Sequence, residues 1–268
     1  MPELPEVETC RRSLRRWTAG RRIVGVDLFD PRSVRQGRSD RPTAGHPEGR
    51  VALDAVVLAA APGEIDRHGK RLLWHFGDRA LLLHLGMTGR WSRIDPPHAK
   101  VCLRLDDGSA LVFADPRLLG GIVPTEGSRG RALLLEGLGP DALGAPLPVF
   151  GGRRAIKVAL MDQAVVAGLG NLHAAEALWR AGIDPRTPAA AVTGARHTVL
   201  QRGVREQLEG TLRMLAEHDE IEYVEDAGAE NPFPLYQRAG SSCPRCGALI
   251  AKMTQAGRST WWCPGCQR

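Results

Sequence analysis

No run of apolar residues in this 268-residue sequence is long enough to cross a membrane, and the first residues lack the uninterrupted apolar core of a signal peptide. Internal repeats are absent as well. Nothing in the sequence therefore indicates export, and we expect an intracellular, cytoplasmic protein. Disulfides are rare in a reducing compartment, so we expect Cys10 and Cys102 to be free thiols.

Lysine is scarce, and arginine supplies most of the positive charge. The formal net charge is +6 and the isoelectric point is about 9.3, a balance that favours polyanionic partners. The guanidinium fork suits phosphate oxygens, although for most of these side chains a solvated helix face is the simpler explanation. Six arginines gather near the N-terminus: Arg11, Arg12, Arg15, Arg16, Arg21 and Arg22.

The N-terminus offers a candidate nucleophile. A small second residue favours removal of Met1, and Pro2 would then carry a free secondary amine. The pKa of such an amine lies below that of a lysine side chain, so more of it is unprotonated at neutral pH. Glu3 and Glu6 are three residues apart and share a face on a helix, so one of them could act as a general acid. The alternative is an ordinary helix start, which proline and glutamate also suit.

Four cysteines form two Cys-x2-Cys pairs separated by sixteen residues. This spacing is typical of a structural zinc site to which each pair supplies two thiolates, so we expect one structural Zn²⁺ rather than two disulfides. Residues 257–260 are predicted to form the hairpin turn between the pairs, with Arg258 at its exposed tip, where it could reach a phosphate. The expected ligands are Cys243, Cys246, Cys263 and Cys266.

The length of the chain suits two domains. Short apolar runs and alternating stretches between residues 51 and 123 predict a β-rich domain, with a hairpin turn at 106–109. Further along, an apolar stripe predicts a helix that carries Val199, Val204, Leu208, Leu212 and Leu215. Half of residues 137–152 are glycine or proline, which favours a linker. We predict a catalytic β-rich domain at 1–136, a linker at 137–152, a helical domain at 153–238 and a zinc finger at 239–268.

Two helical stretches are predicted to meet at the turn Gly168-Leu169-Gly170-Asn171. We expect Asn171 to cap the second helix, whose free N–H groups and dipole would then bind an anion such as a phosphate. Turns of this kind are common, so on local grounds alone the motif is structural.

In their order and spacing these motifs resemble the formamidopyrimidine-DNA glycosylase and endonuclease VIII family of base-excision repair enzymes, and the first branch more than the second. The implied fold is α+β. It comprises an N-terminal β-sandwich domain with flanking helices, a C-terminal helical domain with a helix-two-turn-helix motif, and a zinc-ribbon-like finger. The resemblance rests on residues 2–8, 69–73, 84–89, 115–117 and 162–184 and on the closing cysteine motif with Arg258.

The resemblance implies the catalytic residues. Pro2 would attack C1′ of the flipped nucleotide, and Glu3 would protonate the oxygen of the sugar ring. Glu6 belongs to the same catalytic group. Lys70 would contact the phosphate at the lesion and assist β-elimination, and Arg258 would assist the loss of the second phosphate.

The resemblance also implies the DNA contacts. Met87 and Arg117 would fill the gap left by the flipped nucleotide, which lowers the cost of unstacking. Leu119 takes the third position of this wedge, where relatives usually have phenylalanine. The remaining contacts would be His98, Lys157 and Asn171.

Three further departures from the family pattern stand out. His173 replaces a frequent tyrosine, and Val158-Ala159 replaces a frequent Pro-Trp pair. The third is the segment Glu217–Glu230, where relatives specific for 8-oxoguanine carry a flexible capping loop; here it is short, and seven of its fourteen residues are acidic. Because phosphates would repel these carboxylates, we expect the segment to sit away from the flipped base and to contribute little to base selection.

The sequence therefore predicts a bifunctional DNA glycosylase and apurinic/apyrimidinic (AP) lyase that acts on oxidised bases in damaged duplex DNA by β,δ-elimination. We expect a monomer associated with the nucleoid. One alternative is an endonuclease VIII-like preference for oxidised pyrimidines. Another is a non-catalytic zinc protein that senses damaged DNA, but such a sensor would not need the amine of Pro2.

Overall fold

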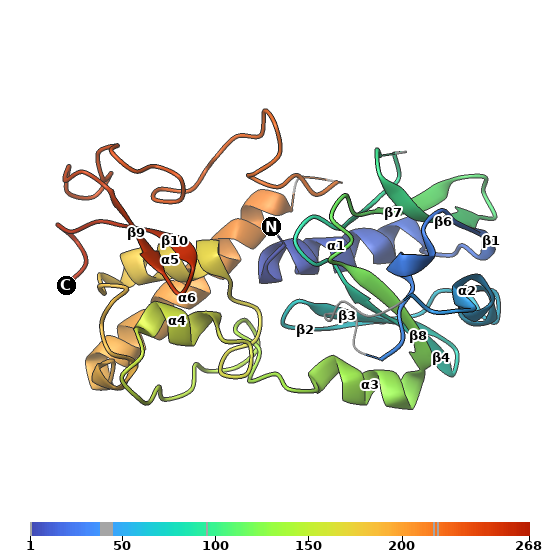
Figure 1. The fold of residues 1–268 in the computed structure, drawn as a ribbon, viewed down its shortest axis with the longest axis horizontal. Coiled ribbons are helices and arrows are strands. Elements are labelled where there is room, and N and C mark those ends of the chain that lie inside the picture. The colour runs from blue at the N-terminus through green and yellow to red at the C-terminus, as the bar shows by residue number, and fades with distance from the viewer. Residues whose placement is uncertain (1, 38–44, 95, 217, 219) are drawn as a thin grey trace. The chain divides into compact units, whose positions relative to one another are not determined.

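The computed structural model describes residues 2–37, 45–94, 96–216, 218 and 220–268 (Figure 1). Met1, Glu217 and Asp219 lie outside the described residues, so the expected removal of Met1 and part of the acidic segment do too. The chain forms two compact units. The first contains Met1–Glu136 and Leu215–Asp226, and the second contains Gly137–Met214 and Ala227–Arg268.

The first unit contains two antiparallel sheets of four strands each. One sheet has the order β1 (Ile23–Leu28), β6 (Ala99–Leu105), β7 (Ala110–Ala114) and β5 (Arg90–Ser92). The other has the order β2 (Ile65–His68), β3 (Arg71–Phe76), β4 (Arg79–His84) and β8 (Gly121–Glu126). The predicted β-rich domain is therefore present, and the predicted α+β class is confirmed.

A single hydrophobic core joins the two sheets to the helices α1 (Leu4–Trp17) and α2 (Gly49–Val57). Trp74 of one sheet meets Trp91 of the other edge to face, with ring centroids 6.3 Å apart. The apolar stripe of α1 packs into this core because its members recur every three or four residues. They are Val7, Cys10, Leu14 and Trp17.

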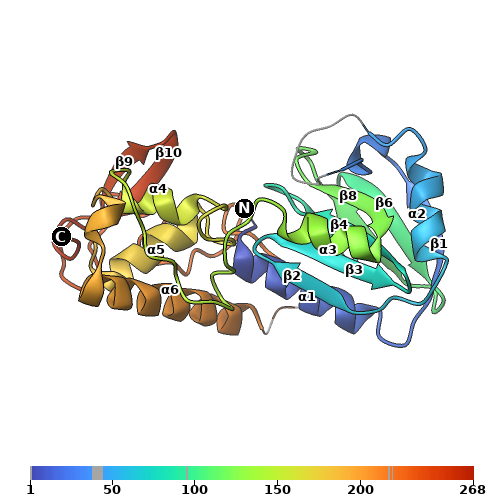
Figure 2. The same cartoon turned by 90° about the horizontal axis from the view of Figure 1, so that it is seen from below.

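The helix α3 (Gly127–Leu135) covers the other face of the second sheet (Figure 2). Leu73, Leu82 and Val123 pack there with Leu134 of the helix. Both faces of β3 and β4 are therefore covered, which explains why these strands read as almost continuous apolar runs in the sequence.

The second unit is mainly helical. The buried stripe of its longest helix differs by one residue from the prediction, since Leu200 is buried and Val199 is partly exposed. Leu200, Val204, Leu208 and Leu212 recur at intervals of four, which keeps them on one face. The elements of this unit are α4 (Ile156–Met161), α5 (Asn171–Ala181), a 3-10 helix η2 (Ala189–Ala191), α6 (Gly194–Leu215), β9 (Ala251–Gln255) and β10 (Arg258–Trp262). The last residue of α6 groups with the first unit. A further 3-10 helix, η1 (Pro31–Ser33), belongs to the first unit.

The segment expected to be a linker, residues 137–152, packs within the second unit instead. Leu147 and Phe150 are buried, and the N–H of Gly139 donates to the carbonyl of Gln163 at 2.9 Å. Its glycines and prolines allow close packing rather than a free hinge. In the described part of the chain, no helix has the length and apolar character needed to span a membrane.

Candidate catalytic and DNA-binding site

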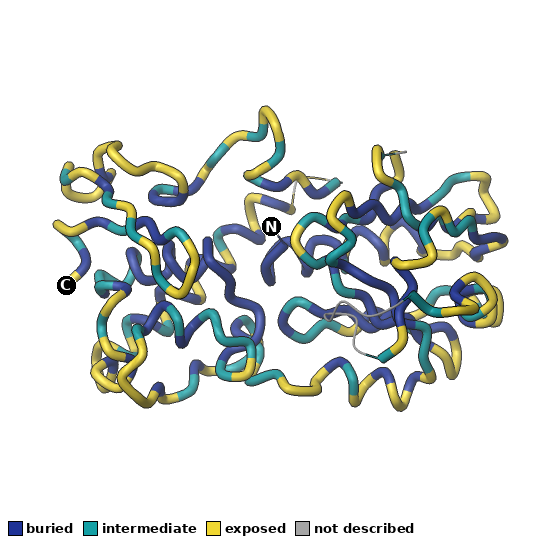
Figure 3. The backbone as a smooth tube through the Cα atoms, viewed as in Figure 1, coloured by how far each residue is buried: buried dark blue, intermediate teal, exposed yellow. Residues whose placement is uncertain are grey.

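The N-terminal end of α1 is buried. Glu3 is the N-cap residue and only 1 % exposed, and Pro2, which precedes it, is also buried. The backbone is coloured as buried along this first turn (Figure 3). The backbone N–H of Glu3 donates to Oε2 of Glu6 at 2.8 Å. The carboxylate of Glu6 therefore fixes the first turn of the helix and satisfies a donor there. The sequence placed Glu3 and Glu6 side by side, and the structure gives Glu6 a positioning contact.

Lys70 lies in the two-residue turn between β2 and β3, after Gly69, whose φ of +55° favours glycine. Arg67 connects this turn to α1. Its Nη1 donates to the carbonyl of Gly69 at 3.1 Å, and its Nε donates to Oε2 of Glu8 at 3.1 Å. The side chains of Arg67 and Glu8 are only 10 % and 7 % exposed, so this ion pair is shielded from water. It couples the position of Lys70 to the helix that follows Pro2.

Glu8 is the acceptor for three arginines of the first unit. Burial raises the pKa of its carboxyl, but the contacts with Arg11, Arg12 and Arg67 outweigh burial and hold the pKa below its ordinary value. Glu8 is therefore ionised at neutral pH, as the pair with Arg67 requires.

Asp115 holds together the two turns that carry the predicted wedge residues. It is fully buried, and its Oδ1 accepts hydrogen bonds from Thr88 Oγ1 at 2.5 Å and from the N–H of Arg117 at 3.2 Å. Its Oδ2 accepts from the N–H of Gly120 at 2.6 Å. One carboxylate thereby joins the turn that carries Met87 to the turn that carries Arg117.

The three predicted wedge residues lie on these joined turns. Met87 and Arg117 are exposed and Leu119 is partly exposed, so all three side chains can reach a ligand. His98 is also exposed, in a left-handed conformation with φ of 67°, and its carbonyl accepts from the N–H of Asp115 at 3.3 Å. The four predicted contacts of the first unit thus share one support.

In the second unit, Asn171 bonds to Lys157, another predicted DNA contact, and to the hairpin that carries Arg258. Its Oδ1 accepts from Nζ of the buried Lys157 at 2.6 Å, and its Nδ2 donates to the carbonyl of Ser259 at 2.9 Å. The expectation that Asn171 caps α5 is wrong, because Gly170 is the N-cap residue and Asn171 is the first residue of the helix. Its side chain is used for the contacts to α4 and β10 instead.

Arg258 is exposed, as predicted, but the hairpin turn lies earlier than expected. The turn residues are Ala256 and Gly257, with φ of 45° and 73°, and Arg258 is the first residue of β10, opposite Gln255. Positive φ at both central residues is the geometry of a type I′ turn. Ser259, whose carbonyl Asn171 binds, directly follows Arg258.

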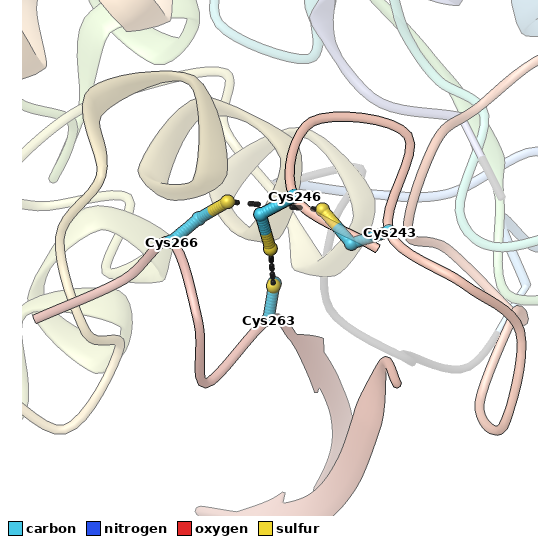
Figure 4. Close-up of side chains that lie close together, drawn as sticks. All are labelled: Cys243, Cys246, Cys263 and Cys266. Atoms are coloured by element: carbon cyan, nitrogen blue, oxygen red, sulfur yellow. Dashed lines mark hydrogen bonds between the residues drawn. The ribbon is translucent and has the colours of Figure 1, made fainter. Parts of the chain in front are cut away.

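The four cysteines converge on one point (Figure 4). Their sulfur atoms all lie within 4.8 Å of one another, and the Sγ atoms of Cys246 and Cys263 are 3.5 Å apart. Burial and the neighbouring sulfurs raise the pKa of Cys266 to about 12. At Cys243, burial is outweighed by hydrogen bonds that include those from the backbone N–H groups of Arg245 and Cys246, and the pKa is lowered to about 6. A Cβ on Gly265 would lie 2.9 Å from the sulfur of Cys246, so the loop leaves room for the ligands alone. The donor set fits a structural Zn²⁺.

The zinc site is anchored to α5. Nη1 of Arg245 donates to the carbonyl of Trp179 at 2.8 Å, and its guanidinium lies over the ring of Trp179, 4.4 Å from the centroid. Gln267 donates from Nε2 to the carbonyl of Ile183 at 2.9 Å and accepts from the N–H of Cys263 at 2.7 Å. The end of α5 and the metal site therefore support each other.

Comparison with known families matches three successive parts of the chain. Residues 1–122 match the formamidopyrimidine-DNA glycosylase N-terminal domain, residues 149–221 match the H2TH domain of the same enzyme, and residues 240–268 match the zinc finger found in FPG and IleRS. The chain belongs to the formamidopyrimidine-DNA glycosylase family. Its members are glycosylase/AP lyases of base-excision repair, and the last match together with the cysteine cluster assigns one structural zinc to this member.

Curated relatives and solved structures agree over the full length of the chain. Formamidopyrimidine-DNA glycosylases of Alkalilimnicola ehrlichii and Laribacter hongkongensis are 38% and 36% identical, with 100% of both chains covered. A Lactococcus lactis FPG mutant bound to Fapy-dG-containing DNA is 28% identical with a TM-score of 0.83. The wild-type Lactococcus lactis enzyme bound to DNA with an oxidised pyrimidine is 28% identical with a TM-score of 0.84. Both structures cover 100% of each chain.

The family substitution at His173 fits its surroundings. The ring is fully buried, its Nδ1 lies 3.1 Å from Nε2 of Gln207, and Phe233 meets it edge to face at 5.8 Å. At the Val158-Ala159 pair, where relatives often have Pro-Trp, Ala159 is buried and Val158 is partly exposed. Neither replacement removes a predicted DNA contact.

Sequence reasoning missed the residues that hold the site in place. Arg67 lies outside every motif and received no role, and Glu8 belongs to a motif from which only its neighbours received roles. Asp115 appeared as part of a motif without a function. The Asp-Pro-Arg sequence was the one available signal, because an aspartate before a turn commonly accepts hydrogen bonds from the backbone N–H groups that follow.

Proposed function

We propose that this protein is a bifunctional DNA glycosylase and AP lyase that uses the amine of Pro2 as its nucleophile. The observation that carries the proposal is the start of α1, where Pro2 and the carboxylate-bearing Glu3 are buried together and Glu6 fixes the turn. Glu3 directly follows Pro2, so neighbouring residues carry the amine and a candidate general acid.

In this mechanism, the lone pair of the Pro2 nitrogen forms a bond to C1′ of the flipped nucleotide. The base leaves with the electrons of the glycosidic bond and takes up the proton that the Pro2 nitrogen loses. Glu3 donates a proton to the ring oxygen as the bond between C1′ and O4′ opens, which leaves an iminium. Loss of a C2′ proton then expels the 3′ phosphate, and a second elimination expels the 5′ phosphate. Lys70 and Arg258 assist these departures as cations.

The DNA-binding residues of each unit support the same proposal. Met87, Arg117 and Leu119 would fill the gap in the duplex, with His98 beside them. Lys157 and Asn171 would bind phosphate next to the finger that carries Arg258. The Zn²⁺ is structural and takes no part in the eliminations. Action on chromosomal DNA would place the protein, as a monomer, in the nucleoid of the cytoplasm.

Two lesion classes are candidates. Formamidopyrimidines and other oxidised purines are favoured by the family. Oxidised pyrimidines form the second class, because the Lactococcus lactis relative has been solved with an oxidised pyrimidine as well as with Fapy-dG. A panel of duplexes carrying formamidopyrimidine, 8-oxoguanine, 5-hydroxycytosine, thymine glycol or an abasic site separates the two by relative rates of excision.

Borohydride trapping tests the mechanism. Protein whose N-terminus is confirmed as Pro2 is mixed with abasic duplex and sodium borohydride, and a covalent protein–DNA complex is expected because the iminium is reducible. Chemical blocking of the N-terminal amine should abolish trapping. Pro2→Gly is a less clean control, because its primary amine can also form an imine. Absence of a trapped complex with processed protein would favour the non-catalytic damage sensor.

A further inference from the structure

Residues 220–226, here called the β5 strap, return to the first unit after α6 and lie against β5. Ile221 and Tyr223 are buried in the hydrophobic core, at 5 % and 3 % exposure. At the far end of the strand, Oε1 of Glu220 accepts from the N–H of Arg93 at 2.8 Å. Residues 220–226 of the acidic segment, which we expected to sit away from the flipped base, are therefore an integral part of the first unit.

Tyr223 is bonded to the turn that carries Met87. Its hydroxyl donates to the carbonyl of Gly89 at 2.6 Å, two residues after Met87. The guanidinium of Arg90 lies over the Tyr223 ring, 4.7 Å from its centroid, and donates to Oδ1 of Asp226 at 2.7 Å. Oδ2 of Asp226 accepts from the N–H of Tyr223 at 2.9 Å, which closes a ring of contacts around the end of the turn.

The hydroxyl of Tyr223 stays protonated and can keep donating its hydrogen bond to Gly89. Burial, followed by the neighbouring Cys10 sulfur, raises the pKa of Tyr223 well above its ordinary value, so the hydroxyl keeps its proton. The negative charge of Glu6 raises the pKa of the same hydroxyl further. Cys10 itself has a pKa raised to about 12 by burial and is neutral.

The wedge turn is held rigidly on its other side. Gly86 has φ of +63°, and a Cβ there would lie 2.3 Å from the N atom of Gly120, so the two turns touch through their backbones. Thr88 is bonded to Asp115. The N–H of Gly89 donates to the carbonyl of Leu85 at 2.8 Å. Met87 thus projects from a turn that is fixed before it by Gly120 and after it by Tyr223.

We propose that Tyr223 is a positioning residue for the wedge: through its hydrogen bond to Gly89, the β5 strap sets the direction in which Met87 enters the duplex. The inference rests on the proposed function, since a wedge matters only where a nucleotide leaves the duplex. It also reverses the role first expected for the acidic segment, which here supports the insertion of Met87.

The test substitutes Tyr223→Phe, which keeps the buried ring and removes the hydroxyl. The first probe is a duplex with a tetrahydrofuran abasic analogue and 2-aminopurine opposite it, whose fluorescence rises when the wedge enters the gap. The second is nicking of a natural abasic site, in a duplex and in the same strand alone. We expect the fluorescence change to fall, and nicking of the duplex to slow about three- to tenfold, the size of one lost buried hydrogen bond. Nicking of the single strand should not change.

Two comparisons separate positioning from simple destabilisation. Val57→Ala removes volume from the same core at a place remote from the turn, and should leave the duplex to single-strand ratio at the wild-type value. In a double-mutant cycle, Tyr223→Phe should have little further effect on nicking of the duplex once Met87→Ala is present.

The inference is overturned if Tyr223→Phe slows both substrates alike, if it changes neither, or if its effect adds fully to that of Met87→Ala. The fluorescence probe requires binding but no chemistry. A wild-type protein that shows the fluorescence change but nicks no abasic DNA would therefore contradict the proposed function and leave the wedge inference standing.

Discussion

The two units hold their functional residues by different physical means. In the first unit, the start of α1, the Lys70 turn and the wedge turns rest on a core shared by two sheets and on buried carboxylates such as Glu8 and Asp115. In the second, Arg258 lies on a two-stranded hairpin that is followed at once by the second pair of cysteines. A two-stranded hairpin is marginal by itself, so the metal replaces the core that the finger lacks.

Loss of the metal should give the largest effect, and it should unfold the zinc finger of the second unit while the first unit stays folded. Cys263→Ser removes a fully buried ligand, so we expect the finger to unfold and the affinity for abasic duplex to fall by at least about tenfold. The first unit should keep its own cooperative transition in calorimetry. Cys102→Ser is the matched control, because Cys102 lies outside the cluster. Simultaneous loss of both transitions would contradict the independence of the two supports.

The ion pair between Arg67 and Glu8 should give the next largest effect. Arg67→Met leaves a buried carboxylate with one partner fewer and should destabilise the first unit by about 3 kcal/mol, with slower β-elimination because the Lys70 turn loses its tie to α1. Arg12 also contacts Glu8, but its side chain is 50 % exposed. Arg12→Met should therefore cost less than about 1 kcal/mol. Denaturant unfolding and single-turnover nicking measure both quantities, and equal effects of the two substitutions would refute the positioning role.

Arg258→Ala sharpens the comparison within the finger. We expect a shift of the products from a one-nucleotide gap toward a β-eliminated nick, because the cation beside the departing 5′ phosphate is lost. The slope of log affinity against log salt should flatten by about one unit. Lys252→Ala removes another exposed cation of the same hairpin and should leave the product ratio unchanged. An unchanged ratio in Arg258→Ala itself would remove this residue from the site.

The smallest effect concerns pH, and its sign should differ between the units. Burial raises the pKa of Glu176, whose Oε1 accepts from the N–H groups of Leu235 and Tyr236 at 2.9 Å. Its contribution to stability is complete below its unfolded pKa of about 4.3 and is lost as the pH rises through the higher folded pKa. Glu8 has a lowered pKa, so its contribution is present above about pH 4.3 and is lost as the pH falls through the lower folded value.

Glu176→Gln should therefore make the second unit relatively more stable as the pH is raised from 4 to 8. The exposed Glu209→Gln on α6 serves as the control and should show no such trend. Unfolding midpoints across this range measure the difference. A stability difference between wild type and Glu176→Gln that does not vary with pH would mean that Glu176 is ionised in the folded protein at no cost.

The features that could be predicted from the sequence are those that residues close together in the chain determine. The zinc ligands were readable because ligand spacing is a property of the chain itself. The apolar runs of β3 and β4 and the helix start at Pro2 were readable for the same reason. The errors fall where a distant partner decides: Asn171 does not cap α5 because Lys157 and Ser259 bind its side chain, and residues 137–152 are not a free linker because Leu147 and Phe150 find a core.

The sequence by itself determined the family and the zinc site, because residue types at short spacing encode both. It also predicts the chemistry of the N-terminal amine and the roles of the wedge and fingertip residues. Only the tertiary structure decided what holds them. Arg67 reaches Glu8 across 59 positions, and Tyr223 reaches Gly89 across 134. Contacts at such separations leave no periodic trace in the sequence, since they depend on how strands and helices pack rather than on the residues that flank them.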